Sequence, residues 1–92
     1  MNEVRLYGRA LEAPKLNESE RGSKWCNLNL DVDGEYYSFL CCQDLAEEVC
    51  HNVEKGQKLI VKGRLSAFNN TCNEFGIVYR PSLIADEVYY VA

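Results

Sequence analysis

Residues 56–65 (GQKLIVKGRL) alternate strictly between two kinds of side chain. Alternation with a period of two is typical of a β-strand whose two faces lie in different environments. We therefore predict a strand that buries one row in a core and turns a cationic row outward. The inner row consists of Leu59, Val61, Gly63 and Leu65, and the outer row includes Ile60, Lys62 and Arg64.

A β-hairpin is predicted around Asp33 and Gly34, because an Asp-Gly pair readily supplies the two φ > 0 positions of a tight turn. Residues 25–32 and 35–42 on either side alternate in the same way. The expected inner rows are Cys26, Leu28, Leu30 and Val32 on the first strand, and Tyr37, Phe39 and Cys41 on the second. The outer rows are Trp25, Asn27, Asn29 and Asp31, and Tyr36, Ser38, Leu40 and Cys42.

Strands are also predicted at the two ends of the chain. Residues 2–9 alternate, and their outward row carries Arg5, Tyr7 and Arg9. The polar residues 10–22 form a loop, with a short extended piece around residues 15–16. Residues 68–76 form a second polar loop, and residues 77–80 begin the last strand. Pro81 interrupts that strand as at an edge or a bulge, and residues 83–91 resume it.

One short helix is predicted between the third and fourth strands. Asp44, followed three residues later by Glu47, indicates an N-cap, and Gly56 after Lys55 indicates the C-terminal end. The face expected to be buried consists of Leu45, Val49, Cys50 and Val53. Three strands, a helix and two strands form the order of an OB-fold, an all-β five-stranded Greek-key barrel with one short helix. At 92 residues, the chain (1–92) is expected to be a single domain.

Charge and cysteine content narrow the classes of function. The net charge of −4 by itself argues mildly against a nucleic-acid partner, but most acidic residues are expected away from the cationic strands. The five cysteines have no Cys-x-x-Cys spacing, so we expect reduced thiols, no metal site and no cofactor. No acid–base or nucleophile set converges, which argues against an enzyme. There is no signal-peptide pattern and no apolar run long enough for a membrane, so a cytoplasmic protein is expected.

Three blocks of the sequence, in order, resemble the bacterial single-stranded DNA-binding protein family. They are MNEVRLYGRA (1–10), Leu45-Ala46-Glu47 with Lys55-Gly56 and LIVKGRL (59–65), and Ala85-Asp86-Glu87-Val88. The resemblance covers essentially the whole chain. It implies an OB-fold that binds single-stranded DNA and assembles as a tetramer of paired dimers, with the first strand often pairing with its copy. It also implies that stacked aromatic rings and basic residues hold the DNA.

Several positions depart from the family's pattern. Tyr36 keeps a stacking ring at the start of the third strand, whereas Cys42 replaces the aromatic residue near its end. A stacking Trp of the family falls near Asn70, where Phe68 is the nearest ring. The hairpin at Asp33-Gly34 is shorter than in the family, and the chain stops at Ala92 without the linker and acidic tip that recruit replication proteins. A phage, plasmid or mobile-element version is one expectation, and a protein similar to primosomal replication protein B is another.

The predicted function is non-enzymatic binding of single-stranded DNA, with little sequence preference, in replication, repair or recombination. The predicted partners are single-stranded DNA, a second copy of the chain in a homodimer or homotetramer, and replication or primosome proteins. The alternative is an OB-fold protein-interaction module that has lost most of its affinity for DNA. A second interpretation places Tyr7 and Trp25 in a dimer interface. It treats Lys62 and Arg64 as ordinary solvated charges on an exposed strand. The candidate DNA-binding residues are Arg5, Tyr7, Arg9, Trp25, Tyr36, Lys62, Arg64 and Phe68.

Overall fold

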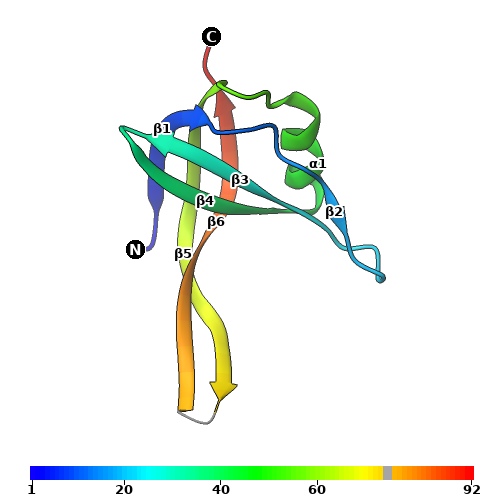
Figure 1. Ribbon diagram of the computed structural model, residues 1–92, viewed down its shortest axis with the longest axis vertical. Coiled ribbons are helices and arrows are strands. Elements are labelled where there is room, and N and C mark those ends of the chain that lie inside the picture. The colour runs from blue at the N-terminus through cyan, green and yellow to red at the C-terminus, as the bar shows by residue number, and fades with distance from the viewer. Residues whose placement is uncertain (74–75) are drawn as a thin grey trace.

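The computed structural model describes residues 1–73 and 76–92, and it describes the side chains of residues 1–66 and 82–92. Six strands and one helix make up the fold of these described residues (Figure 1). In chain order they are β1 (Val4–Ala10), β2 (Asn17–Glu18), β3 (Lys24–Val32), β4 (Glu35–Cys42), α1 (Gln43–Asn52), β5 (Lys58–Asn73) and β6 (Gly76–Tyr90). Among the described residues no helix has the length and apolar character required to cross a bilayer.

The strands close into a barrel because β1 pairs with two partners. The sheet order is β1-β5-β6-β4-β3-β2, and an additional β1–β3 pairing closes the ring. β1 pairs with β5 from Val4 to Arg9, and Arg9 and Ala10 also face Asp31 and Leu30 of β3. β4 and β6 pair in parallel, and the other pairs are antiparallel. This closed barrel with one helix is the predicted OB-fold, with β2 as a short addition on β3.

Two glycines permit the close backbone approaches that closure requires. A Cβ on Gly8 would lie 2.5 Å from the carbonyl oxygen of Asp31. A Cβ on Gly63 would lie 2.1 Å from the carbonyl oxygen of Ile84 and 3.2 Å from the ring of Phe39. The two distances to carbonyl oxygens, 2.5 and 2.1 Å, are too short for any Cβ. Only glycine therefore lets the backbones of β1 and β3, and of β5 and β6, approach so closely at these positions.

The core confirms most of the inner rows. The largest fully buried side chains are Leu28, Leu30, Phe39, Leu59, Val61, Cys26, Cys41 and Val49. The prediction for Leu65 was wrong, since this side chain is 49% exposed. The β1–β5 ladder ends at the Val4–Gly63 pair, so Leu65 lies at the end of the barrel. There the Asn2 side chain accepts a hydrogen bond from the Leu65 N–H at 2.9 Å and donates one to the Leu65 carbonyl oxygen at 2.6 Å.

The helix packs against β3, β4 and β6, but its ends differ from the prediction. It begins at Gln43 with Cys42 at the N-cap and no side-chain cap, so Asp44 lies in the first turn. The reason is that β4 runs directly into the helix, because Cys42 is still paired with Trp25 of β3. The helix ends at Asn52, and Gly56, with φ of +84°, lies in the turn before β5. Val49 and Val53 are buried as predicted, Ala46 is also buried, and Leu45 and Cys50 pack partly buried against the core.

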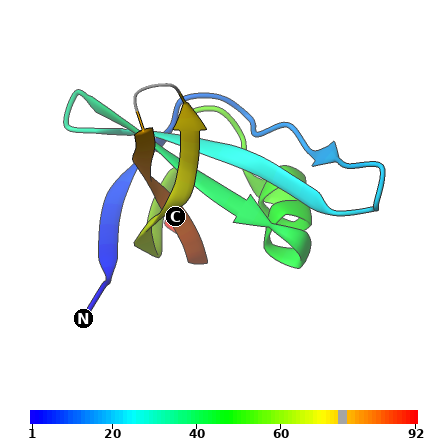
Figure 2. The same cartoon turned by 90° about the horizontal axis from the view of Figure 1, so that it is seen from below.

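Residues 68–73 and Gly76 do not form the predicted loop, because the β5–β6 ladder continues from Asn69–Arg80 to Asn73–Gly76. Residues 74–75 of that predicted loop lie outside the described residues. This two-stranded arm extends beyond the barrel in Figure 1 and is seen from below in Figure 2. A ladder needs only backbone hydrogen bonds, so the polar side chains of this stretch did not reveal it. The sequence predicted an edge or a bulge at Pro81, and a register shift lies opposite it, between the Ser66–Ser82 and Asn69–Arg80 pairs, with the additional residue on β5. The short extended piece expected near residues 15–16 lies slightly further on, as β2.

We predict that Gly8→Ala and Gly63→Ala each lower the free energy of unfolding by roughly 2 kcal/mol or more, because the added methyl group forces two backbones apart. Urea unfolding followed by circular dichroism measures the change. Gly34→Asn is the control, since nothing lies within 4 Å of a Cβ there and Asn tolerates its φ of +89°; a loss of under about 1 kcal/mol is expected. Unchanged stability of both alanine variants would contradict the importance of the two close approaches.

Candidate nucleic-acid interface

The outer rows of β3 and β4 form one continuous surface, here called the stacking face. Cross-strand neighbours on it are Trp25 and Cys42, Asn27 and Leu40, Asn29 and Ser38, and Asp31 and Tyr36. Tyr36 is 72% exposed and Trp25 is 39% exposed. Because a strand rises about 3.3 Å per residue, the two rings stand at opposite ends of a surface on the order of 20 Å long. Two separated, accessible rings suit the stacking of two different planar groups.

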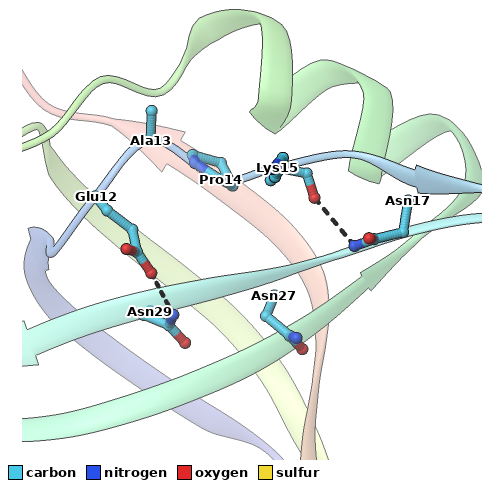
Figure 3. Close-up of a pocket in the computed structure, with 7 residues that line it drawn as sticks. All are labelled: Glu12, Ala13, Pro14, Lys15, Asn17, Asn27 and Asn29. Carbon is cyan, nitrogen blue, oxygen red and sulfur yellow. Dashed lines mark hydrogen bonds between the residues drawn. The ribbon is translucent and has the colours of Figure 1, made fainter.

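A depression of about 330 Å³ borders the stacking face (Figure 3). It lies between the segment after β1 and strand β3, and its lining residues are Glu12, Ala13, Pro14, Lys15, Asn17, Asn27 and Asn29. The Asn29 amide donates to a carboxylate oxygen of Glu12 at 2.9 Å, and the Asn17 amide donates to the Lys15 carbonyl at 3.1 Å. The sequence placed Asn27 and Asn29 on the outer row but gave them no role. The sequence feature that could have indicated a role is the pair of amide side chains two positions apart, on the outward row of one strand.

A second outer surface, here called the β1 face, is built by β1, β5 and β6. One row across it is Tyr7, Ile60 and Tyr89, and the next is Arg5, Lys62 and Glu87. Tyr7 is 53% exposed and Tyr89 is 52% exposed. A shallow hollow of about 260 Å³ is lined by Arg5, Ile60, Lys62 and Tyr89. This surface is separate from the stacking face.

The cations of the β1 face are paired within the chain. The Glu3 carboxylate lies 3.2 Å from Arg5 Nε and 3.3 Å from Lys62 Nζ. The hydrogen bond from Lys62, with the charge of Arg5 alongside, lowers the pKa of Glu3 below its ordinary value. The Tyr89 hydroxyl donates to Glu87, which raises the pKa of Tyr89. The Glu3 carboxylate therefore offsets much of the positive potential that the sequence predicted for Arg5 and Lys62.

Two further predicted cations lie nearer the stacking face. Arg9 is the cross-strand neighbour of both Asp31 and Lys58, so it stands at the border between the two faces. Arg64 faces Ile84, which in turn faces Leu40 of the stacking face, and it forms an ion pair with Asp86.

The predicted set of eight residues is therefore divided. Trp25 and Tyr36 share the stacking face, Arg9 and Arg64 lie at its borders, and Arg5, Tyr7 and Lys62 lie on the β1 face. The side chain of Phe68 falls outside the described residues.

The model of the single-strand binding protein family matches residues 1–91 of the chain. The chain belongs to this family. Among solved structures, the chain is similar to the wild-type single-stranded DNA binding protein from Thermus aquaticus, with a TM-score of 0.79 and 23% sequence identity. The alignment covers 100% of this chain but 41% of that one, so the chain spans about two fifths of its length. No curated protein matches the chain.

In this member of the single-strand binding protein family, Cys42, which replaces an aromatic residue of the family's pattern, is exposed beside Trp25. Cys26 and Cys41 are buried cross-strand neighbours in the core, with the thiol of Cys26 3.9 Å from the carbonyl oxygen of Ala46. Burial raises the pKa of both thiols, that of Cys41 to about 11. Among the side chains described, no three potential metal ligands come together. The two buried thiols are thus protonated core residues at neutral pH.

We predict that the protein loses stability as the pH rises from about 9 towards 11. In the unfolded chain Cys41 ionises near its ordinary pKa of 9.0, whereas in the folded protein its pKa is raised to about 11. Its contribution is therefore complete below pH 9 and is lost as the pH rises through the folded value. Urea unfolding across this range should show that Cys41 accounts for a decrease of roughly 2 kcal/mol in the free energy of unfolding. Cys41→Ala should make the dependence less steep, with the remaining loss of stability due in part to Cys26, whose pKa is also raised. An identical slope in that variant would contradict the assignment.

Proposed function

We propose that the protein binds single-stranded DNA without catalysing a reaction, and with little sequence preference. The observation that carries this proposal is the pair of exposed rings, Trp25 and Tyr36, on the outer face of β3 and β4. In OB-folds this face and the two loops beside it bind oligonucleotides. Here the corresponding flanks are the segment after β1 and the β5–β6 arm (Figure 1). Membership of the single-strand binding protein family supports the same conclusion.

In this proposal the bases stack on Trp25 and Tyr36, which tolerate any base because every base has a π face. Arg9 and Arg64, at the borders of the stacking face, contact phosphates. Asp31 lies directly between Arg9 and Tyr36 in the cross-strand register, so it weakens the attraction of the backbone. Binding therefore depends mainly on stacking. With few phosphates neutralised, we expect the logarithm of affinity to fall with the logarithm of salt concentration with a slope of roughly −2.

We predict that Tyr36→Ala weakens binding of a fluorescently labelled single-stranded oligonucleotide by roughly 5-fold to 150-fold, because one stacked base contributes about 1–3 kcal/mol. Fluorescence anisotropy at several salt concentrations measures both the affinity and the salt slope. Tyr36→Phe is the matched control, since it keeps the ring and removes only the hydroxyl group. No binding by the wild-type protein at low salt would sink the proposal.

A second candidate function is a protein-interaction module with little remaining affinity for DNA. The pairing of Arg5 and Lys62 with Glu3, and of Arg64 with Asp86, favours it, because these cations are already neutralised. Substituting Tyr36, Lys62 and Arg64 together separates the two functions. The first predicts weakened DNA binding with an unchanged oligomeric state, and the second predicts unchanged DNA affinity and altered capture of a protein partner.

We also propose that the chain assembles with copies of itself as a homodimer or homotetramer. From Val4 to Gly8, β1 pairs with β5 on one edge and has no strand partner on its other edge within the described part of the chain. An unpaired strand edge is a ready template for another strand. The adjacent row of Tyr7, Ile60 and Tyr89 supplies apolar surface to bury. Self-association through β1 and the β1 face uses both features.

We predict that Ile60→Asp reduces the molar mass measured by light scattering or sedimentation towards the 10.5 kDa of one chain, since it places a carboxylate in the middle of the apolar row. Tyr36→Ala, on the stacking face, is the control and should leave the mass unchanged. A wild-type mass equal to that of one chain at working concentrations would contradict self-association.

In the cell, the proposed role is the protection or handling of single strands during DNA replication, repair or recombination in the cytoplasm. Replication or primosome proteins are the proposed partners. The family to which the chain belongs supports this placement.

A further inference from the structure

Residues 9–18, here called the flanking segment, lie along one edge of β3 (Figure 3). At one end of the segment Arg9 pairs with Asp31, and at the other end β2 pairs with the start of β3. Between these ends the Leu11 N–H donates to the Asn29 carbonyl oxygen at 2.9 Å. The flanking segment therefore borders the stacking face along nearly the whole of β3.

Lys15 of the flanking segment is held close to Trp25. The side-chain nitrogen of Asn17 donates to the carbonyl oxygens of both residues, at 3.1 Å for Lys15 and 3.4 Å for Trp25. Pro14, the preceding residue, is buried and has a fixed φ, so the backbone has little freedom here. Lys15 itself is exposed and lines the depression of about 330 Å³ beside the stacking face. A cation is thus positioned next to one of the two exposed rings.

Arg9 has the equivalent place at the other end of the flanking segment. It is the cross-strand neighbour of Asp31, and Asp31 faces Tyr36 across β3 and β4. Each of the two exposed rings therefore has a cation of the flanking segment near it. Both cations lie on the β3 side of the stacking face, so a single chain of phosphates could reach both.

These two cations differ from the others near the stacking face in their partners. Lys24 and Arg64 each form an ion pair with a carboxylate of the chain. Within the described side chains, Lys15 and Arg9 form none. A phosphate can therefore bind them without displacing a carboxylate, and each such contact releases counterions from the DNA. Glu12, which lies in the same segment and lines the same depression, carries the charge that opposes them.

We propose that the phosphate backbone of a bound single strand runs along the flanking segment, and that Lys15 contacts a phosphate next to the base stacked on Trp25. On this path Arg9 contacts the backbone near Tyr36, and the bases turn inward over β3 and β4. Contacts by Lys15, Arg9 and Arg64, at about 0.7 each, account for the expected salt slope of roughly −2. The inference rests on the proposed binding of single-stranded DNA and adds the course of the backbone and a residue that contacts it.

Fluorescence anisotropy of labelled oligo-dT with the full chain, over a series of salt concentrations, tests this course. Lys15→Gln is expected to weaken binding roughly threefold to tenfold at about 0.1 M salt and to make the salt slope less steep by about 0.7. The difference from the wild-type protein should disappear at about 1 M salt, because screening removes an electrostatic contact. A purely structural role of Lys15 would instead weaken binding at every salt concentration.

Two control variants accompany Lys15→Gln. Lys15→Arg keeps the positive charge and should keep the salt slope of the wild-type protein. Arg5→Gln removes the same charge from the β1 face, where Glu3 still has Lys62 as a partner, and should also leave the slope unchanged.

Glu12→Gln gives an independent test with the opposite sign. Loss of this negative charge from the flanking segment should strengthen binding of oligo-dT at low salt. The introduced side chain keeps an oxygen that can accept the hydrogen bond from Asn29, so the segment should stay in place.

The outcomes separate the two proposals. If the wild-type protein binds but Lys15→Gln keeps its salt slope, or if Arg5→Gln lowers the slope equally, the course of the backbone is overturned and DNA binding stands. Unchanged or weaker binding by Glu12→Gln also overturns the course. Absence of binding by the wild-type protein at low salt overturns both proposals. Circular dichroism and light scattering of each variant establish that fold and assembly match those of the wild-type protein.

Discussion

The barrel depends on one strand, β1, making two pairings at once. Arg9 and Ala10 face β3 while the rest of β1 runs along β5, and this double pairing closes the sheet. Closure is possible only because Gly8 lets the carbonyl of Asp31 approach where any Cβ would collide. The stacking face and the β1 face diverge from this junction. The geometry of both surfaces therefore follows from a backbone contact rather than from a side-chain interaction.

Ion pairs within the chain reduce the positive potential that the sequence predicted for the outer faces of the strands. Arg5, Lys62 and Arg64 are outward as predicted, yet each has a carboxylate from its own chain beside it. Exposed pairs of this kind contribute little to stability, but they reduce the field that a phosphate backbone would meet. The site that remains is aromatic and amide-rich. Such a surface suits recognition of bases better than attraction of phosphates.

Most of the barrel could be predicted from alternation, because side chains on a strand point alternately to two faces whatever the rest of the fold does. The buried rows at Leu28 and Phe39 followed from it. The turn at Asp33-Gly34 followed from the readiness of an Asp-Gly pair to adopt positive φ, which both residues do. The errors lie where longer-range contacts overrode a local signal. Asp44 is not the N-cap, because β4 leads straight into α1. Leu65 is exposed, because the β1–β5 ladder ends before it. Residues 69–73 pair with β6 instead of forming a loop.

By itself the sequence determined the fold class, the family resemblance and which side chains face outward, since these depend on the order and periodicity of the residues. Only the tertiary structure decided which outward residues share a surface. Trp25 and Tyr36 share one face, whereas Arg5 and Lys62 lie on another with Glu3 between them. Asn29 and Glu12 are seventeen positions apart and become partners only when the segment after β1 lies along β3. Alternation determines on which face of a strand each side chain lies, but the curvature and closure of the barrel determine which side chains of other strands lie next to it.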